Sequence, residues 1–295
     1  MRAFLQEPRA ARRIRRILFY VALGMVLTVF VFPFFWMAFN SFKSHEKILE
    51  YPPVFIFAPT LQNFKNVLWQ TPVVGHTAKQ EPSGSATIFL HFTFNSLVIA
   101  LGALGVGMIL GLPAAYGIAR YRHRRLALGI LICRMIPGIS LLVPSFIVFR
   151  TLGLLDTYLG LIIVHLIITV PLITWIMIGF FEEVPVELEE AARIDGCSRA
   201  GVFLHIALPL VRPGLVSAAI LAFIFTWNSF LFPLILAGVK TKTLPVMVYS
   251  FMTFDYLDLG GIYAASTLIT LPVLIMVLLV QRQFIRGLTI GGVKG

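Results

Sequence analysis

The chain has 295 residues, of which 58% are hydrophobic and only 13% are charged, and its mean hydropathy is +0.90. Soluble domains carry about 25% charged residues, so this composition excludes a soluble globular protein and indicates that a lipid bilayer surrounds much of the chain. The formal net charge of +11 could suggest a nucleic-acid partner, but Lys and Arg stand at the ends of apolar runs, which argues against nucleic-acid binding.

Six apolar runs are long enough to cross a hydrocarbon layer of about 30 Å as helices. We place these spans near residues 17–39, 87–112, 126–149, 159–181, 214–237 and 262–281. The first follows the basic segment "RAARRIRR" (9–16). At roughly 23 residues it exceeds the apolar core of a signal peptide, and no small-residue cleavage site follows it, so we expect a retained span. The sequence predicts an all-α membrane protein with six transmembrane helices in one domain, 1–295.

The segment 40–86 is the longest connection between predicted spans. Its stretch "KQEPSGSAT" (79–87) is rich in Pro, Gly and Ser, which indicates loop rather than a folded domain. The stretch "PTLQNFKNVLW" (59–69) predicts one short amphipathic helix lying on the outer surface.

The distribution of Lys and Arg predicts the orientation in the membrane. Sixteen of these residues lie before the first span, between spans two and three, between spans four and five, and after the last span. The other three connections carry seven. Because cytoplasmic segments carry the excess of Lys and Arg, both termini are expected in the cytoplasm, with 40–86 outside and 182–213 inside.

The segment 182–213 is a polar island between apolar runs. Six of the thirteen acidic residues of the chain lie between Glu182 and Asp195. Pro185 suits the first turn of a helix, the acidic residues favour its N-terminal end, and Gly196 supplies a C-terminal stop.

A second helix is predicted directly after this one. Ser198 can cap a helix over 199–210, which Pro209 and Pro213 break before the fifth span. The island is therefore predicted to be a cytoplasmic helix–turn–helix hairpin, joined to a span at each end.

The hairpin is either a polar connector or a docking surface for another protein. Connections between helices usually have about 2–8 residues, and this one is far longer. The spacing of Leu188, Ala191, Ala192 and Asp195 puts them on one helix face, which is small and slightly apolar. We favour the docking surface.

The island contains an ordered pattern: Glu190-Ala191-Ala192, Asp195-Gly196, Phe203, Ile206, Leu208-Pro209-Leu210 and Pro213. This pattern resembles the EAA signature of ABC importer permeases. Other stretches similar to that family are "FNSLVIA" (94–100), "PAAYGIAR" (113–120), "LGLLDTYLGLI" (152–162), "FTWNSFLFPLIL" (225–236) and "QRQFIRGLTIGGVKG" (281–295). The last two resemble in particular the maltose-permease-type subunits for sugars and related polar solutes.

The resemblance implies the type I ABC importer permease fold, with a cytoplasmic coupling hairpin, in a bacterial cytoplasmic (inner) membrane. It implies as partners a second homologous permease subunit, two ATP-binding subunits and an exterior solute-binding protein, and as solute a sugar or oligosaccharide. ATP and Mg would be bound by the partner ATPase. The residues expected to dock on the ATPase are Glu190, Ala191, Ala192, Asp195, Gly196, Phe203, Ile206, Leu208 and Pro209.

Energy for transport is expected to come from a partner. The chain has no G-x-x-x-x-G-K-[ST] phosphate loop, so it cannot hydrolyse ATP unaided. No Asp or Glu lies inside a predicted span, which argues against an ion-coupled secondary carrier, although His165 in the fourth span leaves that alternative open. Neither Cys133 and Cys197 nor the six histidines show metal-ligand spacing, and we expect no enzymatic activity. An importer for a non-sugar polar solute is the other alternative.

Polar residues inside spans are the candidates for solute contact. Arg134 lies about 12 Å into the third span and either faces a water-filled path or bonds within the protein. Trp227 and Asn228 could stack on a sugar ring and bond to its hydroxyls, or could pack one helix against another. Relatives often read Trp-Asn-Glu where this chain has Ser229 in third place. The prolines expected to kink spans are Pro137, Pro144, Pro171, Pro233 and Pro272.

Overall fold

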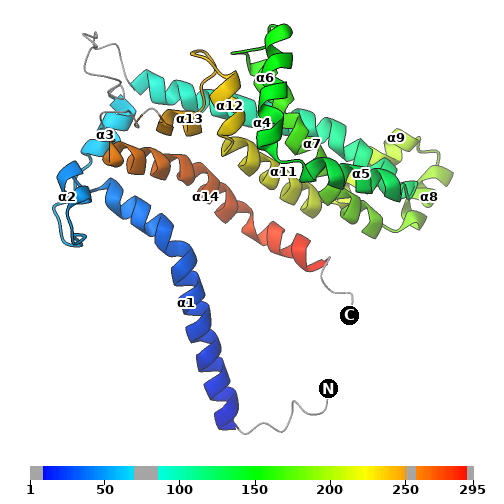
Figure 1. The fold of residues 1–295 in the computed structure, drawn as a ribbon. Coiled ribbons are helices and arrows are strands. Elements are labelled where there is room, and N and C mark those ends of the chain that lie inside the picture. Colours follow the sequence, from blue (N-terminus) through cyan, green and yellow to red (C-terminus); the bar gives the residue numbers. More distant parts are fainter. Residues whose placement is uncertain (1–8, 70–85, 250, 252–256, 291–295) are drawn as a thin grey trace.

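The computed structural model describes residues 9–69, 86–249, 251 and 257–290 (Figure 1). Within these ranges, four helices are long and apolar enough to cross a bilayer. If each of two bent pairs counts as one span, the number of candidate spans rises to as many as six; the pairs are Arg125–Met135 with Gly138–Thr151 and Arg199–Leu210 with Arg212–Trp227. The four long helices are α1 (Arg9–Ser41), α4 (Ala86–Arg120), α7 (Tyr158–Glu183) and α14 (Leu259–Ile290). They overlap four of the six predicted spans.

The third predicted span, 126–149, is broken rather than continuous. Helix α5 (Arg124–Met135) is followed by the 3-10 helix η2 (Gly138–Leu141) and α6 (Leu142–Thr151), and the two parts are bent by 85°. Pro137 lies at the break and has no N–H to continue the helical ladder. A kink was predicted at Pro137, and the structure shows a complete break in the helix there.

The fifth predicted span, 214–237, is also divided. Helix α11 (Arg212–Trp227) ends at Trp227, and α12 (Leu231–Leu236) is a separate short helix. Pro233 lies in α12, where its missing N–H cannot bond to a carbonyl of the preceding turn. By contrast, Pro171 and Pro272 lie inside α7 and α14, which remain continuous helices.

Shorter helices lie at the two ends of the long ones (Figure 1). At one end are α2 (His45–Leu49), α3 (Gln62–Trp69) and α13 (Leu244–Tyr249), and at the other are α8 (Val186–Ile194) and α9 (Arg199–Val202). Helix α3 confirms the short helix predicted within 59–69. Most of the predicted loop "KQEPSGSAT" lies outside the described residues.

Helices α4, α7 and α11 form the centre of the molecule. Gly107 and Gly111 of α4 face Ile173 of α7, and a Cβ added at either glycine would lie 3.0 Å from an Ile173 carbon. Small residues at such contacts let two backbones approach closely. Ala218 and Ala222 of α11 are fully buried in the same cluster. The hairpin 182–213 therefore begins and ends on helices of this core.

At the opposite end of the bundle, a half-buried carboxylate holds the loop that follows α12. Asp156, between α6 and α7, has a left-handed backbone (φ 55°). Its side chain accepts hydrogen bonds from the backbone of Gly238, Lys240 and Thr241 at 2.9, 3.2 and 2.9 Å, and from the Thr241 hydroxyl at 2.8 Å. Burial raises the pKa of Asp156, but these hydrogen bonds outweigh burial and hold the pKa below its ordinary value.

Replacing Asp156 by asparagine should loosen the loop at 238–241. Asparagine tolerates the left-handed backbone, so the change tests the charge, and the loss of charged acceptors should cost about 1–3 kcal/mol. Because the pKa of Asp156 is lowered in the folded protein, its carboxylate contributes fully to the free energy of unfolding above the unfolded-state pKa of about 3.9. This contribution is lost as the pH falls through the pKa of Asp156 in the folded protein. Thermal unfolding in detergent at neutral and acidic pH checks this. An equal melting temperature for both proteins at neutral pH would contradict it.

Candidate functional site

The first helix of the hairpin, α8, follows from its local sequence. It begins at Val186, directly after Pro185, with Glu187 and Glu189 in its first turn, where acids favour the positive end of the helix dipole. Arg193 lies in the last turn, where a cation is favourable. The helix ends at Ile194.

The turn that follows α8 is a Schellman motif. The Cys197 N–H donates to the Ala192 carbonyl at 2.9 Å, and the Gly196 N–H donates to the Arg193 carbonyl at 3.1 Å. Gly196 has φ +91°, a backbone that residues with a Cβ rarely adopt. The Ser198 hydroxyl then accepts from the Gly201 N–H at 3.1 Å and caps α9. The stop predicted at Gly196 and the cap predicted at Ser198 are both confirmed.

The second half of the hairpin changes its helical form before it meets α11. Helix α9 continues as a π-helical turn, η3 (Phe203–Ala207), and as α10 (Leu208–Leu210). The axis then bends by 81° between Leu210 and α11. Pro213, in the first turn of α11, has no N–H to continue the helix across this bend. Isolated π-helical turns often occur at functional sites.

The structure divides the predicted docking residues between two faces. Glu190, Ala191, Asp195, Gly196 and Pro209 are exposed, whereas Ala192 is buried and Phe203, Ile206 and Leu208 are half-buried. Phe203 packs its ring against Tyr116 and Phe181, with ring centroids 5.1 and 6.1 Å apart. Phe203 therefore anchors the hairpin on the bundle, and the exposed residues form its free face.

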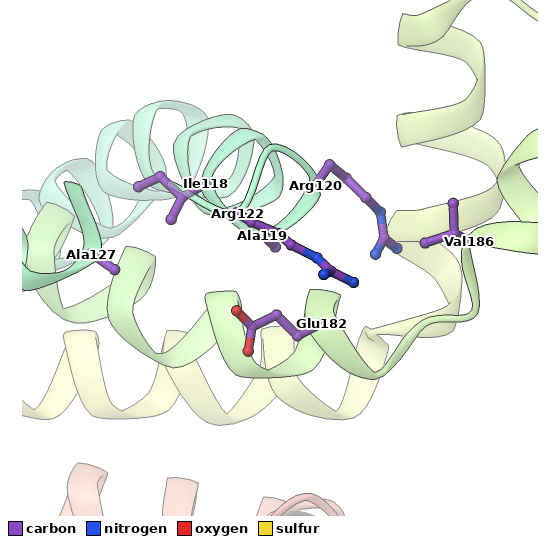
Figure 2. A pocket seen from close by; sticks show the side chains of 7 residues that line it. All are labelled: Ile118, Ala119, Arg120, Arg122, Ala127, Glu182 and Val186. Carbon is purple, nitrogen blue, oxygen red and sulfur yellow. The ribbon is translucent and has the colours of Figure 1, made fainter. Parts of the chain in front are cut away.

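A cavity of about 360 Å³ lies beside the hairpin, where α4 and α7 end and α5 begins (Figure 2). Arg120 at the end of α4, Arg122 in the turn after α4 and Glu182 near the end of α7 point toward it. Val186, the first residue of α8, also lines the cavity. Beside the cavity, side-chain contacts connect the hairpin to α4.

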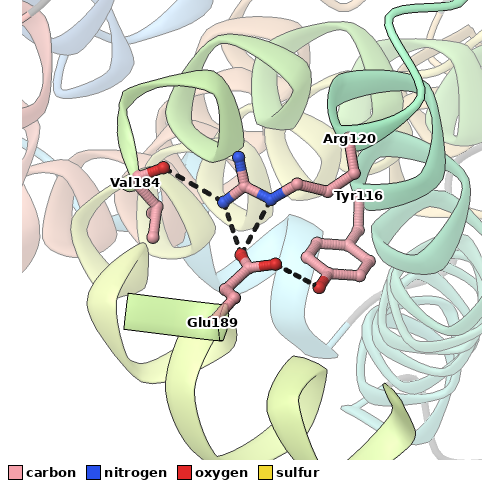
Figure 3. A network of polar contacts seen from close by, with 4 residues as sticks. All are labelled: Tyr116, Arg120, Val184 and Glu189. Atoms are coloured by element: carbon pink, nitrogen blue, oxygen red, sulfur yellow. Dashed lines mark hydrogen bonds and ion pairs between the residues drawn. The ribbon is translucent and has the colours of Figure 1, made fainter. Parts of the chain in front are cut away.

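One ion pair makes this connection (Figure 3). Arg120, the last residue of α4, donates from Nε to Glu189 Oε1 of α8 at 2.8 Å and from Nη2 to the same oxygen. The Tyr116 hydroxyl donates to Glu189 Oε2 at 2.6 Å, and Arg120 Nη2 also donates to the Val184 carbonyl at 3.2 Å. The Arg120 and Glu189 side chains are only 13% and 8% exposed. Both carboxylate oxygens are satisfied, so this pair fixes α8 to the end of α4.

This pair was not predicted from the sequence. Glu189 stood there only as one acid of the island, whereas Glu189 and Ala192 are the buried residues of α8. The i, i+3 spacing of Glu189 and Ala192 could have indicated an inward-facing acid. Its partner Arg120 stands in the stretch "PAAYGIAR", and nothing in the sequence relates that stretch to residue 189.

Trp227 packs between α11 and α14. Its side chain is 1% exposed, it stacks on Phe223 with ring centroids 5.6 Å apart, and its Nε1 donates to the Ile269 carbonyl of α14 at 3.1 Å. Of the two alternatives for Trp227, these contacts favour the packing of one helix against another. Asn228 is exposed at the end of α11, and its Nδ2 donates to the Ile224 carbonyl at 3.1 Å.

Arg134 and His165 have different surroundings. Arg134 is exposed and lines a cavity of about 230 Å³ at the break between α5 and η2. His165 is 1% exposed, and its Nδ1 lies 2.6 Å from the Leu161 carbonyl. Among the described residues, no group of three or more His, Cys, Asp or Glu is placed to hold a metal ion.

Comparison with known proteins agrees with this architecture. The model of one protein family, described as "binding-protein-dependent transport system inner membrane component", matches residues 103–290. The trehalose transport system permease SugB of Mycobacterium tuberculosis is 39% identical over 70% of this chain and 78% of its own length. The trehalose/maltose permease MalG of Thermococcus litoralis is 33% identical over 96% and 98%, and the sulfoquinovosyl glycerol permease SmoH of Agrobacterium fabrum is 33% identical over 94% and 93%.

Solved structures share the fold. A subunit of a bacterial ABC transporter that imports the acidic polysaccharide alginate matches with a TM-score of 0.72 at 22% identity, over 94% of this chain and 99% of that one. A subunit of the MetNI methionine ABC transporter matches with a TM-score of 0.55 at 20% identity, over 67% and 95%. These similarities confirm the predicted type I ABC importer permease fold.

Proposed function

Because this chain belongs to the family of binding-protein-dependent transport system inner membrane components, we propose that it forms the translocation path for a sugar or oligosaccharide in an ATP-driven importer. The chain itself is a multi-pass inner-membrane permease subunit. The proposal that the solute is a sugar is supported by relatives at 33–39% identity, whose names include trehalose, maltose and sulfoquinovosyl glycerol. A second, homologous permease subunit would complete the path.

The hairpin 182–213 is the proposed docking site for the ATPase, which binds ATP and Mg. The observation that supports this role most directly is the Arg120–Glu189 pair. It ties α8 to α4 inside the chain, while Glu190 and Ala191 on the same short helix remain exposed. A movement imposed on the free face of α8 would therefore reach α4 through this pair and α11 through the second half of the hairpin.

The orientation is proposed from the Lys and Arg distribution. Both termini would lie in the cytoplasm, on the same side as the hairpin. The solute-binding protein would dock at the opposite end, where α2, α3 and α13 lie (Figure 1).

The function is tested by separating the chain from its partners. Tagged chain purified from native membranes should carry a co-purifying ATPase. Stripped of it and placed in liposomes, the chain should not accumulate trehalose under a proton or sodium gradient, because no acidic residue lies inside a predicted span. Accumulation of labelled trehalose by the chain alone would establish a secondary carrier instead. If mass spectrometry found a non-sugar solute in a co-purified binding protein, the solute of this importer would not be a sugar.

A further inference from the structure

Arg134 is the only formally charged side chain inside the six predicted spans. An arginine at this depth costs several kcal/mol unless water or a counter-charge stabilises it. Within the described part of the chain, the Arg134 guanidinium has no hydrogen-bond or ion-pair partner. The ten acidic residues in that part of the chain lie in connections or at helix ends, outside the predicted spans.

The surroundings of Arg134 form a cavity rather than a lipid-facing surface alone. The cavity of about 230 Å³ lies where α5 breaks at Pro137, and η2 and helices α7, α11 and α12 supply its other walls. Phe225 and Phe232 line it together with Arg134 and Cys133. Pockets for drug-sized ligands measure about 300–1,000 Å³, so this cavity is smaller than a complete site for an oligosaccharide. A second permease subunit would supply the rest.

We propose that Arg134 binds an anionic group of the transported solute, so that the importer selects a sugar bearing a carboxylate, sulfonate or phosphate. The guanidinium presents its donors in a planar fork that matches two oxygens of such a group. The low dielectric of the surrounding apolar walls strengthens the attraction. The inference rests on the proposed function, since it specifies the solute of the same path.

The adjacent Cys133 provides a direct test, because it is exposed and lines the same cavity. The other cysteine, Cys197, is first replaced by serine. The assembled complex in membranes is then treated with an anionic and with a cationic methanethiosulfonate of similar size. The ratio of the two modification rates reports the charge of the cavity, because any effect of Arg134 on the thiol's own ionisation cancels.

The ratio should favour the anionic reagent by about tenfold. Arg134→Gln should abolish this preference and Arg134→Lys should keep it. Arg150→Gln, the same change at an exposed residue outside the cavity, should leave the ratio unaltered. Glucuronate should slow the modification of Cys133, whereas glucose at the same concentration should not, and the Gln variant should remove the protection.

A ratio near one in the unmodified protein, or one unaffected by Arg134→Gln, would overturn the proposal and indicate that a partner subunit neutralises the guanidinium. Equal protection by glucose and glucuronate, or none by glucuronate, would overturn it as well. The labelling requires no transport. An importer that carries only neutral sugars would refute this inference while the proposed function stands, and a chain without an ATPase partner would refute the proposed function.

Discussion

Replacing Arg120 by glutamine should release α8 from the end of α4 and abolish ATP-driven uptake. The change leaves the Glu189 carboxylate buried without its cation, which costs about 3 kcal/mol. Insertion into the membrane should be normal, because Arg120 lies at the end of its helix. Limited trypsin cleavage after Arg193 and Arg199, which are exposed on either side of the hairpin turn, measures the local opening.

The double variant Arg120→Gln/Glu189→Gln tests whether the two residues act through their ion pair or independently of each other. It leaves no unpaired buried charge, so its cleavage rate should lie closer to that of the unmodified protein than the rate of either single variant. The exposed pair Lys47–Glu50 is the matched control. Its side chains are 46% and 45% exposed, so Lys47→Gln should change neither cleavage nor uptake. Normal uptake in Arg120→Gln would remove this pair from the coupling mechanism.

Replacing Gly196 by valine should have a comparably large effect. No atom lies within 4 Å of an added Cβ at Gly196, so the cost comes from the backbone alone. At φ +91° a β-branched residue is strained by about 1–3 kcal/mol, and the Schellman turn should open. Transport should fall and the ATPase should co-purify less, while the amount of protein in the membrane stays the same.

Gly179→Val is the matched control for Gly196. This glycine lies inside α7, also with no atom within 4 Å of an added Cβ, but with ordinary helical backbone. The same side chain is therefore tolerated at 179 and strained at 196. Equal transport by both variants would show that the conformation of the turn does not matter for coupling.

Local signals along the chain predicted the hairpin well. Pro185, Gly196 and Ser198 act within a few residues of themselves, through helix capping and backbone conformation, so a single sequence contains their effect. The same holds for the apolar runs that became α4 and α7. By contrast, the break at Pro137 was read only as a kink, because the packing that directs α6 away by 85° is not visible in the sequence.

Contacts between distant residues could not be predicted. Arg120 and Glu189 are 69 positions apart, and the single sequence gives no sign that they meet. The chemistry of Trp227 left solute contact and helix packing both open, because its orientation depends on α14, where the Ile269 carbonyl accepts its N–H. The chemistry of a side chain thus indicates what it can bind, and the packing of other helices decides what it contacts.

Cross-linking from the free face of α8 tests the central claim, that the hairpin docks on an ATPase. With Cys133 and Cys197 replaced by serine, Glu190→Cys is treated with a short bifunctional thiol reagent in native membranes. The exposed Leu274→Cys on α14 is the control. We expect a cross-link to the ATPase from position 190 and none from position 274. If position 190 gives no cross-link while the ATPase still co-purifies with the chain, the ATPase binds elsewhere and the hairpin is only a connector.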